Sequence, residues 1–169
     1  MNNKEVMRTK NVLVTKASFF HINAHQEVKM KHAPLSDKEE GIATAIVDAA
    51  YAVHSNLGPG LLENVYEVCF CHELRKRTLK ESRQVVVSIV YDSITFDEGL
   101  RLDVLVEELV ICELKAVETM NPVFMAQLLT QLKLTEKRLG FLINFCVRSA
   151  LPPEGNVSRI KDGIQRVIL

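Results

Sequence analysis

Apolar residues recur at helical spacing in the first part of the chain that shows regular order. From residue 42 to residue 53 they lie three or four positions apart, which is the period of one helix face. Ser36 and Glu39 precede them in a capping-box pattern, so we expect a helix from Ser36. Gly58-Pro59-Gly60 ends it, because glycine accepts the left-handed cap and proline cannot continue a helix. A second helix is expected over about residues 61–77.

The pattern then changes from helical to strand-like. Residues 84–91 are rich in β-branched side chains and end in a polar turn at Asp92-Ser93. Residues 100–106 alternate between apolar and polar side chains. Glu107-Glu108 predicts a hairpin turn into a third strand at residues 109–117.

A third helix and two more strands complete the predicted order. Asn121-Pro122 is typical of a helix start, with an N-cap and a proline at the first helical position, and the helix extends to about residue 136. Strands are expected at 139–147 and 163–169, with a Pro/Gly loop at 151–156 between them. The order helix, helix, three strands, helix, strand, strand indicates an α/β fold with a central mixed β-sheet flanked by helices.

The composition is that of an ordinary globular protein with balanced charge. The chain has 169 residues, of which 47% are hydrophobic, and its 21 basic residues are offset by 21 acidic ones. These values exclude a disordered or fibrous chain, and the length suits one domain. No apolar run approaches the ~20 residues of a membrane-spanning helix. Zero net charge argues against a protein that coats nucleic acid through a generally basic surface.

The N-terminal segment differs from the rest in charge. Residues 1–35 hold six basic and two acidic residues, a net charge of +4, and the other 15 basic and 19 acidic residues leave −4. It is interpreted as a loosely ordered arm, or as a start codon assigned too early, with Met30 as the true start; six basic residues spread over 35 favour these over a polybasic nucleic-acid-binding tail. The folded domain is expected at residues 36–169. Four scattered cysteines without zinc-type spacing predict free thiols, and the absence of a secretory signal predicts a cytoplasmic protein.

The charged residues that packing explains least lie on the two strands joined by the turn at residues 107–108. Glu113 and Lys115 share one face of an otherwise apolar strand, because side chains alternate along a strand. Asp103 lies on the preceding strand, and the hairpin can bring it level with Glu113. Two carboxylates provide oxygen ligands for a hard cation, and an ammonium can orient or activate water, so the set suits a hydrolytic magnesium site. The spacing also fits an exposed Glu–Lys pair or a buried structural ion pair.

Two helical positions add to this pattern. Glu63 begins a helix face that includes Tyr66 and Glu67, and Gln127 and Gln131 lie one turn apart on the third predicted helix. By themselves, such residues are typical of a solvated helix surface.

The motifs taken in order resemble the GxxExxY proteins, a branch of the PD-(D/E)xK nuclease-like superfamily. The signature matches Gly60-Leu61-Leu62-Glu63-Asn64-Val65-Tyr66, and the likeness extends over about residues 42–169. It includes Arg101-Leu102-Asp103, Glu113-Leu114-Lys115-Ala116 and Ala126-Gln127-Leu128-Leu129. One departure is Leu102, which stands where the superfamily pattern has the proline of the PD pair.

The resemblance implies a restriction-endonuclease-like core and a metal-dependent nuclease acting on DNA or RNA. Asp103, Glu113 and the backbone carbonyl of Leu114 would bind Mg²⁺ or Mn²⁺, and Glu63 would complete the acidic cluster. Lys115 would be the catalytic lysine, and Gln127 would contact the water or the scissile phosphate. Arg101 is one of several scattered cations suited to phosphate contacts, and Tyr66 matches the pattern without an assigned role. The alternative is a non-catalytic module that uses the same fold to bind DNA or protein.

Overall fold

The first helix begins and ends where the sequence predicts. The computed structural model describes residues 33–147 and 160–169; the predicted loop at 151–156 and almost all of the predicted arm at 1–35 lie outside this range. In α1 (Asp37–Leu57), the Ser36 hydroxyl accepts from the Glu39 N–H at 3.3 Å, and the Ser36 N–H donates to Glu39 Oε2 at 2.7 Å. Gly58, at φ 65°, ends the helix in the left-handed region. The capping-box prediction is confirmed.

The remaining elements follow the predicted order. They are α2 (Glu63–Lys76), β1 (Glu81–Tyr91), β2 (Ile94–Val106), β3 (Val110–Lys115), α3 (Pro122–Leu134), β4 (Leu139–Asn144), the 3₁₀ turn η1 (Ile160–Gly163) and β5 (Ile164–Ile168). The hairpin turn predicted at Glu107-Glu108 forms, and the polar turn predicted at Asp92-Ser93 is also a hairpin turn, with all four residues at positive φ. The boundary predicted for β2 is wrong: the strand starts six residues before residue 100, because β1 pairs with it down to the Tyr91–Ile94 turn.

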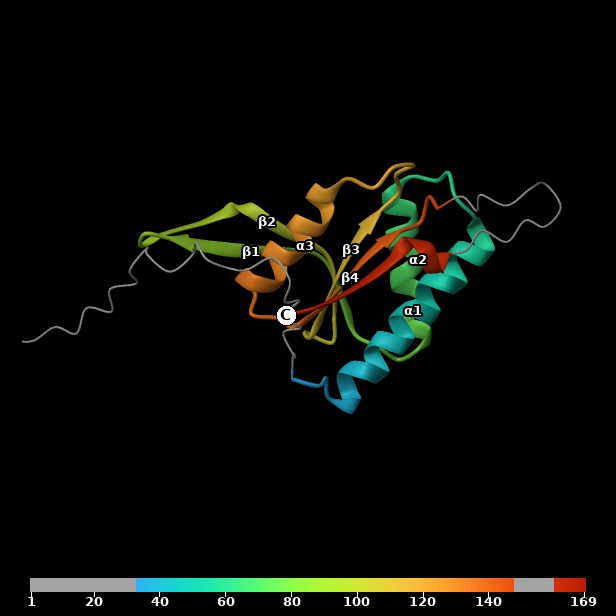
Figure 1. Ribbon diagram of the computed structural model, residues 1–169, viewed down its shortest axis with the longest axis horizontal. Coiled ribbons are helices and arrows are strands. Elements are labelled where there is room, and N and C mark those ends of the chain that lie inside the picture. Colours follow the sequence, from blue (N-terminus) through green and yellow to red (C-terminus); the bar gives the residue numbers. More distant parts are fainter. Residues whose placement is uncertain (1–32, 148–159) are drawn as a thin grey trace, which may run out of the picture. The chain divides into compact units, whose positions relative to one another are not determined.

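The described strands form one mixed sheet in the order β1-β2-β3-β4-β5. Strands β3 and β4 are parallel, and the other three neighbouring pairs are antiparallel. Helix α3 makes the crossover between the two parallel strands (Figure 1). The sheet and its flanking helices confirm the predicted α/β class.

The helices bury the two faces of the sheet separately. Helices α1 and α2 pack over one core, which includes Val104, Cys112 and Leu114, and α3 packs over a second core, which includes Leu105 and Ile111. These residues alternate along β2 and β3, as expected for strands covered on both faces. The face under α3 is therefore the one that also carries Glu113.

Gly140 on β4 lets α3 approach the sheet closely. A Cβ atom there would lie 2.9 Å from Leu128 Cδ1 and 3.1 Å from Leu132 Cδ1. Because contacts this short require the neighbours to shift, a larger residue would force the Leu128 and Leu132 side chains of α3 to move.

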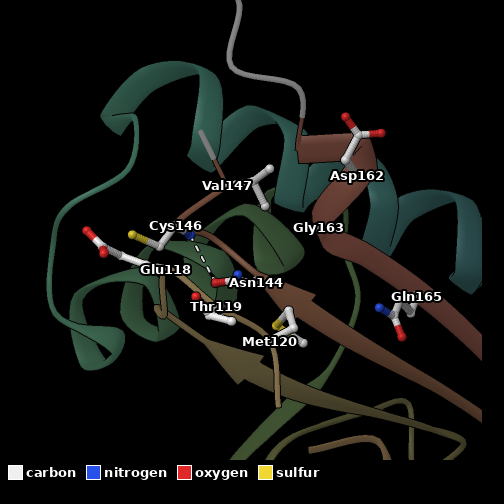
Figure 2. A pocket seen from close by; sticks show the side chains of 9 residues that line it. All are labelled: Glu118, Thr119, Met120, Asn144, Cys146, Val147, Asp162, Gly163 and Gln165. Atoms are coloured by element: carbon white, nitrogen blue, oxygen red, sulfur yellow. Dashed lines mark hydrogen bonds between the residues drawn. The ribbon is translucent and has the colours of Figure 1, made fainter. Parts of the chain in front are cut away.

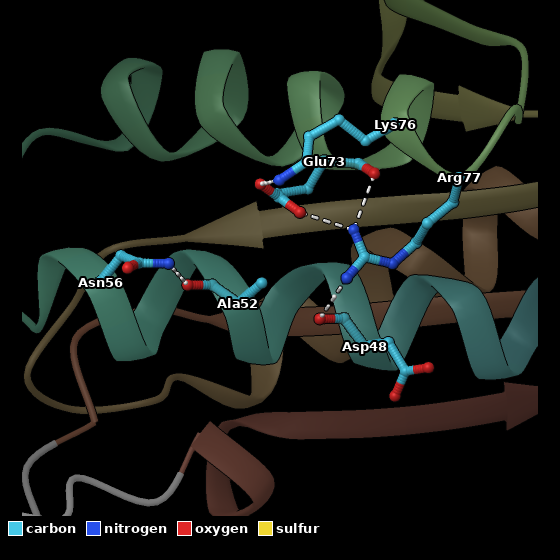
Figure 3. Close-up of polar contacts among 6 residues, drawn as sticks. All are labelled: Asp48, Ala52, Asn56, Glu73, Lys76 and Arg77. Carbon is cyan, nitrogen blue, oxygen red and sulfur yellow. Dashed lines mark hydrogen bonds and ion pairs between the residues drawn. The ribbon is translucent and has the colours of Figure 1, made fainter.

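Charged residues join the C-terminal end of α2 to α1 (Figure 3). The Arg77 guanidinium donates to the Glu73 carboxylate at 2.6 Å and to the Asp48 carbonyl at 3.4 Å, and Lys76 pairs with Glu73 at 2.7 Å. The cations are partly exposed, with the Arg77 side chain at 29% and that of Lys76 at 57%, so each contact contributes about 1 kcal/mol. Among the described helices, none is long and apolar enough to cross a membrane.

Candidate active site

The ladder between β2 and β3 ends beside Asp103. Val104 pairs with Cys112. Further along β3, the Leu114 N–H donates to Asp103 Oδ2 at 2.9 Å. A carboxylate thus takes the place of a strand carbonyl, and the bond holds Asp103 against β3.

The opposite side of β2 is also irregular at this point. The β1–β2 pairing passes from Arg83–Val104 to Val85–Leu102, and Gln84, which lies between, has a φ of 51°. Leu102 belongs to the core under α3 and Val104 to the core under α1 and α2, although residues two apart on a regular strand share a face. The strand therefore departs from regular alternation at Asp103.

Glu113 and Lys115 meet on the face covered by α3. Lys115 Nζ donates to Glu113 Oε1 at 2.6 Å and to the Leu114 carbonyl at 2.9 Å, and it lies 3.9 Å from Asp103 Oδ2. The side chains of Asp103, Glu113 and Lys115 are only 17%, 7% and 12% exposed. The structure therefore brings together the three residues that the strand pattern singled out, with the carbonyl of Leu114 among them.

Burial and charge at this point perturb two of the three groups. Burial, together with the charge of Glu113, raises the pKa of Asp103 to about 6. Burial lowers the pKa of Lys115, but the hydrogen bond and charge of Glu113, with the charge of Asp103, outweigh it and raise the pKa overall. Lys115 is therefore a protonated cation at neutral pH, and it offsets part of the charge of the two carboxylates.

Of the two glutamines on α3, Gln131 contacts the carboxylate of Glu113, and the predicted contact of Gln127 with water or phosphate stays a prediction. Gln131 Nε2 donates to Glu113 Oε2 at 2.7 Å, whereas Gln127 is exposed on α3. Gln131 is 4% exposed, and its Oε1 is buried without a hydrogen-bond partner among the described residues. Its place beside Leu128 and Leu132 in the apolar stripe of α3 is the sequence signal that could have identified it.

Gln127 and Arg101 border the same open pocket. The pocket has a volume of about 340 Å³ and lies between the Gly99–Arg101 part of β2 and α3, with Glu113 and Gln131 also on its wall. Arg101 is exposed at this site. The two predicted substrate-contacting residues therefore lie near Glu113 without touching it.

Glu63 lies outside the contact network. It is the exposed first residue of α2, and within the described part of the chain it makes no hydrogen bond or ion pair. Its charge adds to those that raise the pKa of Asp103 and Lys115, as the weakest of the contributors. The place of Glu63 in the acidic cluster stays a prediction.

Tyr66 holds the loop that precedes Glu63. Its hydroxyl donates to the Gly58 carbonyl at 2.7 Å and accepts from the Leu61 N–H at 3.1 Å. Its buried ring stacks on Phe145, with the ring centroids 4.8 Å apart. Because α2 begins without a side-chain cap, Tyr66 is the anchor of this helix start.

A larger pocket of about 440 Å³ lies elsewhere, at the ends of β3 and β4 (Figure 2). None of the predicted site residues lines it. Asn144 on its wall is buried, and its amide is used for structure: Oδ1 accepts from the N–H groups of Val117 and Cys146, and Nδ2 donates to the Val117 carbonyl. This amide joins the segment after β3 to the segment after β4.

Two buried titratable side chains lie outside the candidate site. All four cysteines are free, as predicted, and burial raises the pKa of Cys71 to about 12, which disfavours the reactive thiolate. His54 Nδ1 lies 3.1 Å from the Phe145 carbonyl, and burial lowers the pKa of the imidazole.

The donor set at Asp103 fits a hard divalent cation. Two carboxylates and the Leu114 carbonyl offer only oxygen, which Mg²⁺ and Mn²⁺ prefer. The unpartnered Oε1 of Gln131 shows that hydrogen-bonding capacity beside Glu113 is unused. Across residues 33–147 and 160–169, no group of three or more His, Cys, Asp or Glu side chains is arranged to hold a metal ion. The fit therefore rests on two carboxylates and a carbonyl.

Comparison with known proteins agrees with this architecture. The model of the PD-(D/E)XK nuclease superfamily matches residues 40–158, which is well over half of the chain. No curated protein and no solved structure gives a significant match. The family match confirms the expected restriction-endonuclease-like core, while the narrower GxxExxY assignment stays a prediction. From residue 40 to residue 158, across both strands of the site and helix α3, this chain belongs to the PD-(D/E)XK nuclease superfamily.

Proposed function

We propose that this protein is a metal-dependent nuclease that hydrolyses phosphodiester bonds of DNA or RNA. The proposal rests mainly on one observation. Asp103, Glu113, the Leu114 carbonyl and Lys115 lie together where the β2–β3 ladder ends. Membership of the nuclease superfamily supports the same reaction class.

Asp103, Glu113 and the Leu114 carbonyl would hold Mg²⁺ or Mn²⁺. Such an ion supplies Lewis-acid activation and neutralises phosphate charge. Glu113 is fixed by Gln131 and Asp103 by the Leu114 N–H, so each carboxylate keeps one oxygen in a defined place. Glu63, the exposed first residue of α2, is proposed as a further acidic ligand.

Lys115 acts by charge in this proposal. Its raised pKa keeps the ammonium protonated, so it cannot take a proton from water at neutral pH. It can instead orient the attacking water or stabilise the phosphate oxygens through hydrogen bonds. Gln127 and Arg101, on the wall of the pocket beside Glu113, are proposed to contact the phosphate backbone.

The test is cleavage of single-stranded and double-stranded DNA and RNA, with Mg²⁺, with Mn²⁺ and with chelator. We expect metal-dependent cleavage that is lost in Lys115→Ala and in Asp103→Asn. Lys38→Ala and Asp48→Asn are matched controls, because both side chains are exposed on α1, outside the candidate site, and these variants should keep full activity.

The same preparations separate the alternatives. Equal cleavage by the wild type and Lys115→Ala would point to a contaminating nuclease and would overturn the assigned mechanism. Nucleic-acid binding without cleavage on any of these substrates, and without a metal requirement, would favour the non-catalytic binding module.

A further inference from the structure

We propose that the pocket between β2 and α3 receives one nucleobase of the substrate strand, an adenine or a cytosine. Gln131 Oε1 accepts a hydrogen bond from the exocyclic amino group of that base. Gln131 then has two uses, because its Nε2 holds Glu113 and its Oε1 selects the base. The inference rests on the proposed function and deepens it, since the pocket opens beside Glu113.

The unused group on the pocket wall is a hydrogen-bond acceptor. Gln131 is 4% exposed, its Nε2 donates to Glu113 Oε2 at 2.7 Å, and its Oε1 has no donor among the described residues. Gln131 and Glu113 both line the pocket, so the amide end of the glutamine lies at the wall. Only the amide nitrogen can donate to a carboxylate, which fixes the orientation of the amide. Because a buried acceptor without a donor is costly, the wall favours a ligand that brings an N–H group.

The need for a donor separates the parts of a nucleotide. A phosphodiester offers only acceptor oxygens, and deoxyribose within a strand has no hydroxyl. Adenine and cytosine carry an exocyclic amino group, which donates, next to a ring nitrogen, which accepts. The Gln127 amide and the Thr130 hydroxyl line the same pocket and can donate to that ring nitrogen. The polar groups of the wall therefore match one edge of an amino-bearing base.

The pocket also has the size and lining for one base. Its volume of about 340 Å³ lies at the lower end of the range for small-molecule sites. Leu100, Val123 and Ala126 give it apolar wall against which a flat ring can pack, and exposed Arg101 suits the phosphate of the same nucleotide. Two paired bases do not fit such a space, so the base must come from a single strand or leave its pair.

The test removes one functional group from the ligand. Short oligodeoxyadenylate is compared with the same strand built from unsubstituted purine, which lacks only the amino group. Binding is followed by fluorescence anisotropy in chelator, where a metal-dependent nuclease leaves the strand intact, and kcat/KM with Mg²⁺ gives the same ratio independently. We expect the adenine strand to be preferred about fivefold, the contribution of one hydrogen bond. The preference should disappear in Gln131→Met.

The ratio separates base recognition from damage to the acidic site. Gln131→Met also releases Glu113, so binding and cleavage can weaken for every strand, but only lost recognition of the amino group brings the ratio to one.

A second variant fills the pocket without altering Gln131. Ala126→Leu adds bulk to the wall and should weaken binding of the adenine strand about tenfold. Ser55→Leu is the matched control, because Ser55 is a small exposed residue on α1, outside the pocket, and this variant should bind like the wild type.

The outcomes distinguish the base pocket from the nuclease proposal. Metal-dependent cleavage with equal use of the adenine and purine strands, or a preference that survives in Gln131→Met, would overturn the base pocket and leave the nuclease standing. So would Ala126→Leu binding as tightly as Ser55→Leu. Tighter binding of RNA than of DNA, with no effect of the amino group, would assign the donor to the ribose hydroxyl instead. Neither binding nor cleavage of any strand by the wild type would overturn both proposals.

Discussion

The hydroxyl of Tyr66 should contribute substantially to stability. Tyr66→Phe removes one oxygen and leaves the ring stacked on Phe145. The loss breaks the bond to the Gly58 carbonyl and the bond from the Leu61 N–H, both at a position where the tyrosine is fully buried. The variant therefore separates the polar role of the signature tyrosine from its packing role.

The magnitude follows from these two bonds. A hydrogen bond contributes about 1 kcal/mol net, and a partner left unsatisfied costs about 1–3 kcal/mol. Because the loop can still reach some water, we expect a loss of about 2 kcal/mol in the free energy of unfolding. For a domain of this size that lowers Tm by roughly 4–8 °C.

Urea unfolding followed by circular dichroism measures the loss. Tyr51→Phe is the matched control, since Tyr51 is 56% exposed on α1 and its variant should unfold like the wild type. The midpoint for Tyr66→Phe should fall with an unchanged slope. A change below about 0.5 kcal/mol, equal to that of Tyr51→Phe, would show that the loop before α2 does not depend on the hydroxyl.

Three further outcomes are expected. The pKa of Asp103 is about 6 in the folded protein against an ordinary 3.8, so as the pH rises the unfolded chain loses this proton before the folded protein does. The free energy of unfolding without metal should therefore fall by about 2–3 kcal/mol between pH 4 and pH 6. Asp103→Asn should flatten this pH dependence in urea unfolding. Asn144→Leu leaves three backbone groups unpaired and should cost about 3 kcal/mol by urea unfolding, whereas exposed Asn56→Leu should cost under about 1 kcal/mol. Gly163→Ala places a methyl group against the Asn144 carbonyl and should lower stability by about 1–3 kcal/mol in the same assay.

Local patterns were sufficient to predict most of the fold. The capping box at Ser36, the Asn121-Pro122 start and the polar turn at Glu107-Glu108 each act within a few residues, so they are readable without tertiary information. The first part of β2 was not readable in this way. Its residues 94–99 include two acids and Gly99, which interrupt the alternation, and they are extended because β1 pairs with them.

The candidate site was predictable in its residues but not in its contacts. Alternation along β3 and the hairpin register identified Asp103, Glu113 and Lys115. The choice between Gln127 and Gln131 depends on which side of α3 meets β3, and that is fixed by helix packing. The fold-back of Lys115 onto the Leu114 carbonyl depends on a rotamer choice that no sequence pattern encodes.

The pKa of Asp103 bears on the ion-pair interpretation that the strand pattern left open. A carboxylate held in a structural ion pair is stabilised in its charged form, which lowers its pKa. At Asp103 the opposite holds: burial and Glu113 outweigh Lys115 and the Leu114 N–H, so the charged form is unfavourable in the metal-free protein. One ammonium offsets only one of the two negative charges, and a divalent cation can offset the remaining one. Lys115 and Glu113 do form such a structural pair, since Glu113 raises the pKa of Lys115, so it is Asp103 whose charge this pairing leaves unfavourable.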